Sequence, residues 1–128
     1  MKDSMHYKDW FQKSDEDFAV AKLLFKESDF MDTVGFHLHQ AIEKYLKGFL
    51  LFNDQDYPLI HNLTMLLQQC GKFDNDILDY SEECERLNGY FISSKYPVDP
   101  PTDYPKEEMQ KSIEMAEFLI KYISKKTE

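Results

Sequence analysis

The sequence has no long apolar run, and its 128 residues include only two cysteines and one arginine. Without a long apolar run, we expect no helix that spans a membrane. The first ten residues, MKDSMHYKDW, lack the apolar core of a secretion signal, so we expect a cytoplasmic protein. Cys70 and Cys84 do not form a Cys-x-x-Cys pattern, and each falls on the apolar side of a predicted helix. This placement favours buried free thiols over a disulfide or a metal site.

Cations are scarce, because 15 lysines and arginines are set against 24 aspartates and glutamates, for a formal net charge of −9. Broad electrostatic binding to nucleic acid needs clustered cations that displace counterions from the phosphates. The excess of acidic residues argues against such binding, but it is compatible with a local basic cleft. The single arginine, Arg86, is either a functional cation or the partner of Glu82 in an ion pair on a helix surface. The three acids at positions 15–17 are predicted to form a solvated face and not a metal cluster, because successive helical positions point in different directions and cannot converge on one ion.

Apolar residues recur at helical spacing through most of the chain, and there is no alternating strand pattern and no repeat. Five helical segments are predicted, at about 7–27, 30–52, 62–70, 76–93 and from 105 onward. The length and the apolar content fit one domain, residues 1–128, with a single core. The sequence therefore predicts an all-α fold, an up-and-down four-helix bundle with an additional short helix.

The segment FHLHQAIEKYLKGFLL, residues 36–51, is the predicted central helix. Two apolar stripes at helical spacing predict burial on two sides, as in the middle of a bundle or at a subunit interface. Polar residues are nevertheless dense on this helix. His39 and Glu43 are spaced for a hydrogen bond or a shared ligand. A partly buried His39 whose proton is held by Glu43 is favoured over a metal site, because zinc needs three or four converging ligands.

Two further pairs on the same helix have i,i+4 spacing, Glu43 with Lys47 and Gln40 with Lys44. They either stabilise the helix or line a cleft in which the lysines attract phosphate, and the residues alone leave both interpretations open. His61 stands at the start of the third predicted helix. A cap whose ring binds a free backbone amide is favoured there, with a general acid–base group as the alternative.

The stretch HQAIEKYLKGFLL resembles the signature helix of HEPN domains (higher eukaryotes and prokaryotes nucleotide-binding), whose motif runs roughly His/Gln-Gln-Ala-x-Glu-Lys-x-x-Lys. Three other features resemble that family in the same order along the chain. Trp10 lies in a first amphipathic helix, His61 precedes a leucine-rich helix, and Lys95-Tyr96-Pro97 closes the fourth helix. The resemblance covers nearly the whole chain and implies a HEPN-like bundle.

The resemblance also implies a function, namely binding of a nucleotide or RNA in a cleft lined by the second and fourth helices. A frequent partner in such families is a minimal nucleotidyltransferase, in a toxin–antitoxin-like system. Abundant apolar surface on the central helix adds the expectation of a homodimer. We expect no metal and no cofactor. The expected ligand contacts are His39, Gln40, Glu43, Lys44, Lys47, His61, Arg86, Lys95 and Tyr96.

One feature departs from the family. RNA-cleaving members carry an arginine and then, after four to six residues, a histidine, whereas Arg86 is followed by LNGYFISSKYP. Tyr90 and Phe91 stand where the histidine would fall, and tyrosine at its ordinary pKa is a poor base near neutrality. We therefore expect no catalytic residue. The alternatives are a divergent metal-independent endoribonuclease that uses a histidine from elsewhere, and a structural homodimer without ligand.

Overall fold

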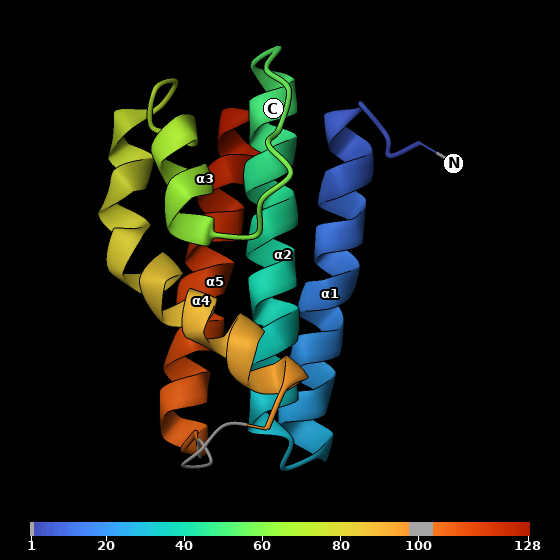
Figure 1. The fold of residues 1–128 in the computed structure, drawn as a ribbon, viewed down its shortest axis with the longest axis vertical. Coiled ribbons are helices and arrows are strands. Elements are labelled where there is room, and N and C mark those ends of the chain that lie inside the picture. The colour runs from blue at the N-terminus through green and yellow to red at the C-terminus, as the bar shows by residue number, and fades with distance from the viewer. Residues whose placement is uncertain (1, 98–103) are drawn as a thin grey trace.

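The computed structural model describes residues 2–97 and 104–128. The described residues contain helices and no strand, which confirms the predicted all-α architecture. The elements in chain order are α1 (Tyr7–Glu27), α2 (Met31–Phe52), α3 (Leu63–Cys70), the 3-10 helix η1 (Asn75–Tyr80), α4 (Ser81–Lys95) and α5 (Lys106–Lys126). In Figure 1, α1, α2 and α5 run along the length of the bundle, and α4 crosses them obliquely.

Helix α2 is the central element of the bundle, because it packs against each of α1, α3, α4 and α5. Its apolar residues Leu38, Ile42 and Leu46 are completely buried, and so are residues on other sides of the helix such as Ala41. A helix buried on more than one side needs two apolar stripes, which is the pattern that the sequence shows. None of the described helices is long and apolar enough to cross a membrane.

Helix α1 is joined to α2 by polar contacts as well as by apolar packing. The Tyr45 hydroxyl donates to Asp15 over 2.9 Å, and Asp17 binds both Lys44 and His37 of α2. Asp15 and Glu16 are exposed, as predicted. The prediction is wrong for Asp17, which is half-buried because its side chain reaches sideways to donors on α2. No group of three His, Cys, Asp or Glu in the part of the chain that the structure describes could hold a metal ion.

The fourth predicted helix, 76–93, is in fact two elements, η1 and α4, with α4 extending to Lys95. Asp74 caps η1 by accepting from the backbone N–H of Asp76 over 3.1 Å. Both cysteines are buried and free, as predicted. Burial raises the pKa of the Cys70 and Cys84 thiols to about 12, so both stay protonated and unreactive.

Gly35 of α2 lets α4 approach closely. A Cβ atom at this position would lie 2.5 Å from Cγ of Tyr90, whose side chain is buried. We expect overpacking in Gly35→Ala to lower the free energy of unfolding by about 1–3 kcal/mol. The higher helix propensity of alanine offsets up to about 1 kcal/mol of this loss. Urea unfolding followed by circular dichroism measures this change.

Gly89→Ala is the matched control, because an added Cβ at Gly89 meets no atom within 4 Å. This substitution should raise the free energy of unfolding by about 0.5–1 kcal/mol, since it only removes the entropic cost of a glycine inside a helix. Equal effects of the two substitutions would contradict the close approach at Gly35.

Candidate functional site

Glu43 lies at the centre of a buried polar cluster, where α2 meets the segment that precedes α3. Its side chain is 5% exposed. Oε2 accepts from Nζ of Lys47 over 3.1 Å, and Oε1 lies 2.9 Å from Nδ1 of His61. An ionised carboxylate only accepts, so His61 donates from Nδ1. Glu43 thus serves two donors at once, which offsets the cost of burying its charge.

His39 lies beside this carboxylate and is completely buried. Its Nε2 donates to the backbone carbonyl of His61 over 2.8 Å, and its Nδ1 accepts from Nε2 of Gln40 over 3.3 Å. Burial lowers the pKa of His39 to about 4, so the ring is neutral at pH 7. The predictions of a partly buried ring and of a proton held by Glu43 are therefore wrong. Nδ1 is 3.9 Å from Glu43, and the His61 carbonyl holds the proton instead.

His61 does not cap α3, which corrects the interpretation that the sequence favoured. Asn62 is the cap, because its Oδ1 accepts from the backbone N–H of Met65 over 3.1 Å. Asn88 of α4 also holds the start of α3, since its Oδ1 accepts from the backbone N–H of Leu63 over 2.8 Å. The side chain of His61 is 60% exposed. With Nδ1 bound to Glu43, its Nε2 has no hydrogen bond within residues 2–97 and 104–128.

Phe91 of α4 lies between the imidazole and a lysine. Its ring stacks on His61, with the ring centroids 5.2 Å apart, and Nζ of Lys95 is 4.2 Å from its centroid. Tyr96 follows and is 67% exposed. Phe91 was not among the predicted site residues, although its i,i+4 spacing to Lys95 was a usable signal. We call the surface formed by His61, Phe91 and Lys95 the His61 face.

Two predicted site residues lie away from the His61 face. Lys44 is bound to Asp17 on the α1 side of α2. Arg86 lines a hollow between α4 and α5, and within the described residues it forms no ion pair with Glu82. Because Arg86 and Phe91 are five residues apart, they project from α4 about 140° apart. The predicted single cleft is therefore divided between two sides of α4.

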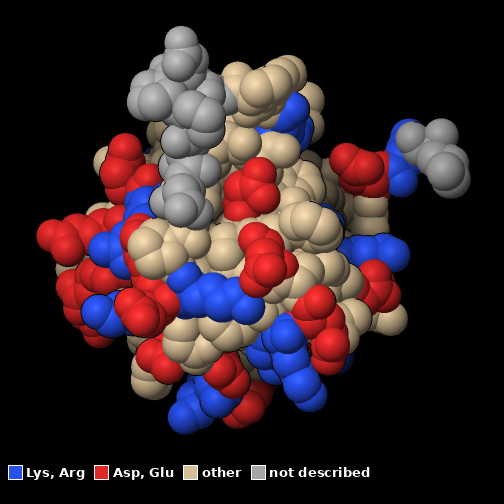
Figure 2. Space-filling view, turned by 90° about the horizontal axis from the view of Figure 1, so that it is seen from below, with Lys and Arg blue, Asp and Glu red and all other residues tan. Residues whose placement is uncertain are grey.

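The charge at one end of the bundle is mixed. Figure 2 shows this end, where acidic and basic side chains are interspersed and do not gather into a broad basic field. On the His61 face, an ammonium and an exposed imidazole nitrogen share one aromatic platform. Such groups can bind a phosphate or another small anion. An imidazole that a buried carboxylate holds through Nδ1 is also oriented for proton transfer.

Comparison with known proteins gives consistent results. A family model described as "HEPN domain" matches residues 7–126. Over 127 residues the chain is 23% identical to the Methanocaldococcus jannaschii protein named "Putative toxin MJ1304", and the alignment covers 89% of this chain and 83% of that protein.

Two crystal structures share the fold. TT1696 from Thermus thermophilus superposes with a TM-score of 0.82 at 24% identity, covering 94% of this chain and 97% of that one. ST0689, described as an archaeal HEPN homologue, superposes with a TM-score of 0.78 at 20% identity over all of both chains. At these identities the two structures establish the fold alone.

Proposed function

The chain belongs to the HEPN domain family, and we propose that it is a HEPN-type binding protein that associates with a nucleotide or RNA through the His61 face. The observation that carries this proposal is the hydrogen bond of 2.9 Å from His61 to the buried Glu43. A buried carboxylate that fixes the orientation of an exposed imidazole is expected in a preorganised binding site, whereas a histidine on an ordinary solvated surface needs no such support.

The chemistry of the His61 face suits a phosphate ester with an attached base. Lys95 supplies a fixed positive charge for the phosphate. Nε2 of His61 accepts from a ribose hydroxyl when the ring is neutral, and donates to a phosphate oxygen when the ring is protonated. Tyr96 follows Lys95 in the chain and is exposed, and its ring offers a surface on which a base can stack. His39 and Lys47 do not contact the ligand themselves. His39 positions the backbone of His61, and Lys47 positions Glu43.

Substitution of Lys95 tests this assignment. Titration calorimetry of Lys95→Gln with a nucleotide and with short single-stranded RNA should show weaker binding than the wild type. The slope of log affinity against log salt should fall in magnitude by about 1, because one phosphate contact is lost. Lys72→Gln, which removes an exposed lysine elsewhere, should leave both quantities unchanged. Unaltered affinity and slope in Lys95→Gln, or no binding by the wild type, would refute the assignment.

We further propose a minimal nucleotidyltransferase as the protein partner, in a toxin–antitoxin-like system. Family membership supports this partner, and so does the name of the Methanocaldococcus relative. Co-expression with a small nucleotidyltransferase encoded beside this chain should give a complex that survives size-exclusion chromatography. Separate elution of the two proteins at micromolar concentration would remove this part of the proposal.

A second candidate function, endoribonuclease activity, is favoured by the orientation of His61 alone. If the protein cleaves RNA, His61→Ala should abolish cleavage. Arg86→Ala should retain it, since Arg86 lines the hollow beside α5. Cleavage that survives both substitutions would indicate a contaminant and exclude a role for His61. If the wild type neither binds nor cleaves any RNA or nucleotide, the third alternative, a structural homodimer, is what remains.

A further inference from the structure

The segment that joins α2 to α3 carries His61, and Tyr57 lies four residues before it. Figure 1 shows this segment passing along α2, and its side chains contact that helix. Between Gln55 and His61 the backbone forms no hydrogen bond within residues 2–97 and 104–128. Side chains therefore hold this stretch. Tyr57 is one of them, because its ring is partly buried against the hydrophobic core.

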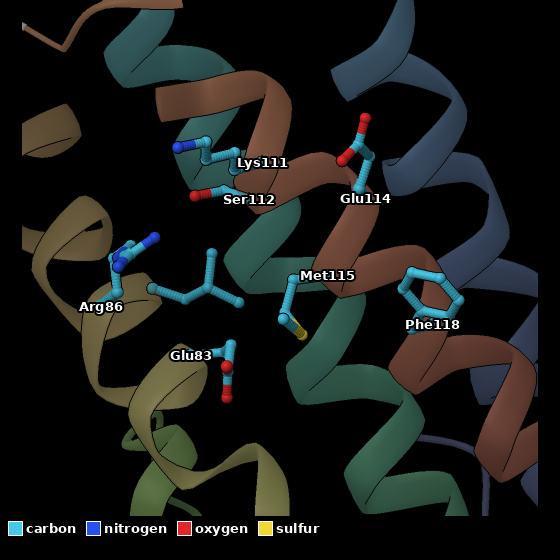
Figure 3. A pocket seen from close by; sticks show the side chains of 8 residues that line it. Glu83, Arg86, Lys111, Ser112, Glu114, Met115 and Phe118 are labelled. Atoms are coloured by element: carbon cyan, nitrogen blue, oxygen red, sulfur yellow. The ribbon is translucent and has the colours of Figure 1, made fainter. Parts of the chain in front are cut away.

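Tyr57 contacts the ammonium that supports Glu43. Nζ of Lys47 lies 5.5 Å from the centroid of the Tyr57 ring, which is within the range of a cation–π interaction. The same ammonium donates to Oε2 of Glu43, whose other oxygen binds His61. One cation is thus shared between the Tyr57 ring and the carboxylate that orients the imidazole. Arg86 cannot replace Lys47 there, because it lines the hollow between α4 and α5 (Figure 3).

A second set of contacts joins Tyr57 to the N-terminal segment, residues 2–6. The ring of Trp10 in α1 packs edge-on against the Tyr57 ring, with the centroids 4.7 Å apart. Nε1 of Trp10 donates to the backbone carbonyl of Ser4 over 2.7 Å. The Tyr57 hydroxyl lies 3.4 Å from Oδ2 of Asp3. The N-terminal segment is therefore fastened to the two aromatic rings, and one of these rings contacts Lys47.

We propose that Tyr57 is a positioning residue for His61, and that residues 2–6 reinforce its action by holding the Tyr57 ring in place through Trp10. The ring keeps water from Lys47, and an ion pair is stronger where water is excluded. Glu43 then holds the Nδ1 proton of His61, so that Nε2 of the neutral imidazole is an acceptor. Without the Tyr57 ring, water competes for both charges and the imidazole exchanges between its two tautomers.

This inference deepens the proposed function, and its consequence for ligand binding rests on that function. Residues 2–6 are mostly exposed and are fastened by few hydrogen bonds. Segments of this kind open locally at a small cost in free energy. A partner that takes up residues 2–6 would loosen His61 and weaken binding at the His61 face. The N-terminal segment is thereby a point at which binding is regulated.

Nuclear magnetic resonance of the histidine rings tests the hold on His61 without any ligand. Long-range proton–nitrogen spectra at pH 8 show which nitrogen of a neutral imidazole carries the proton. In the wild type, His61 should carry it on Nδ1. In Tyr57→Leu the proton should be distributed between Nδ1 and Nε2, because the anchor is loosened. Tyr57→Phe keeps the ring beside Lys47 and should retain the wild-type spectrum.

Tyr122→Leu is the matched control, because Tyr122 of α5 is also a partly buried tyrosine whose hydroxyl donates to an aspartate, Asp74. This substitution should leave the His61 tautomer unchanged. Trp10→Phe removes the hydrogen bond to Ser4 and keeps an aromatic ring, so it should shift the spectrum part of the way toward that of Tyr57→Leu. Trp10→Phe also decides the matter if circular dichroism shows that Tyr57→Leu does not fold.

A wild-type His61 without a fixed tautomer would overturn the inference, and so would wild-type spectra in both Tyr57→Leu and Trp10→Phe. A change in Tyr57→Leu alone would overturn the part assigned to residues 2–6.

Titration calorimetry with short single-stranded RNA measures the consequence for binding. The affinity of Tyr57→Leu should fall by about 5-fold or more, whereas Tyr57→Phe and Tyr122→Leu should bind as the wild type does. Unchanged affinity in Tyr57→Leu, together with a lost tautomer, would refute the link to binding. No binding by the wild type would refute the proposed function, while the tautomer of His61 would still support or overturn the role of Tyr57. The two failures are therefore distinguishable.

Discussion

Glu43→Ala is expected to lower the free energy of unfolding by about 3–5 kcal/mol, among the largest effects of any single substitution in this chain. The ammonium of Lys47 is nearly as buried as the carboxylate that it binds, over 3.1 Å. Without the carboxylate, that charge stays buried without compensation, and Nδ1 of His61 loses its acceptor. Urea unfolding of the wild type and the variant at pH 7 measures the difference.

A double variant separates the effect of the Glu43 charge on stability from the effect of Glu43 on ligand binding at the His61 face. Glu43→Met combined with Lys47→Met removes both charges, and the acceptor for Nδ1 of His61, at similar volume, and buried ion pairs are often replaced by apolar residues at little cost. We expect most of the lost stability to return while affinity at the His61 face stays reduced, because the imidazole remains unanchored. A loss of less than about 1 kcal/mol in Glu43→Ala would contradict the buried pair, since exposed ion pairs contribute that little.

The second large effect is a loss of stability with acid that originates from His39. In the unfolded chain its pKa takes the ordinary value of 6.5, and burial lowers it to about 4 in the fold. Between these pH values the unfolded chain binds a proton that the folded chain does not. The free energy of unfolding therefore falls as the pH drops from 6.5 to 4, by about 3 kcal/mol in total. Urea unfolding at a series of pH values from 7.5 to 4 measures this loss.

His39→Asn isolates this contribution from the other titrating groups. Asparagine does not titrate, and its amide can still donate toward the His61 carbonyl. The variant should be less stable than the wild type at pH 7, because the packed ring is lost. The gap between the two stability curves should narrow by about 3 kcal/mol as the pH approaches 4. Curves that stay parallel would show that the pKa of His39 is not lowered in the fold.

The helices could be predicted from the sequence because their signals are local. From apolar spacing, the first helix was predicted at 7–27, and α1 indeed begins at Tyr7 and ends at Glu27. The same spacing indicated burial of α2 on two sides. The change from η1 to α4 could not be predicted, because the apolar pattern runs through both elements without interruption. The contacts that Asp15 and Asp17 make with α2 were also missed, since their partners there lie 20 to 30 residues away in the sequence.

The candidate site was predicted less completely than the fold, for a related reason. The pair Glu43 and Lys47 follows from helical spacing alone and is present. The contact between Glu43 and His61 spans 18 residues and depends on the path of the chain before α3, which no periodicity encodes. The same path places the His61 carbonyl over His39, so the spacing of His39 and Glu43 suggested the wrong hydrogen bond. Arg86 was misplaced because its orientation depends on how α4 crosses α2.

The chain around position 61 is held by its backbone. The backbone carbonyl of His61 accepts a hydrogen bond from the ring of His39. The backbone N–H of Leu63, two residues further on, donates to the side chain of Asn88. Neither contact depends on which amino acid occupies position 61. The path of the backbone at position 61 is thus independent of the side chain there, and what the imidazole itself adds is the second donor to Glu43. Another side chain that donates to this carboxylate could replace the imidazole without a change in the scaffold beneath it.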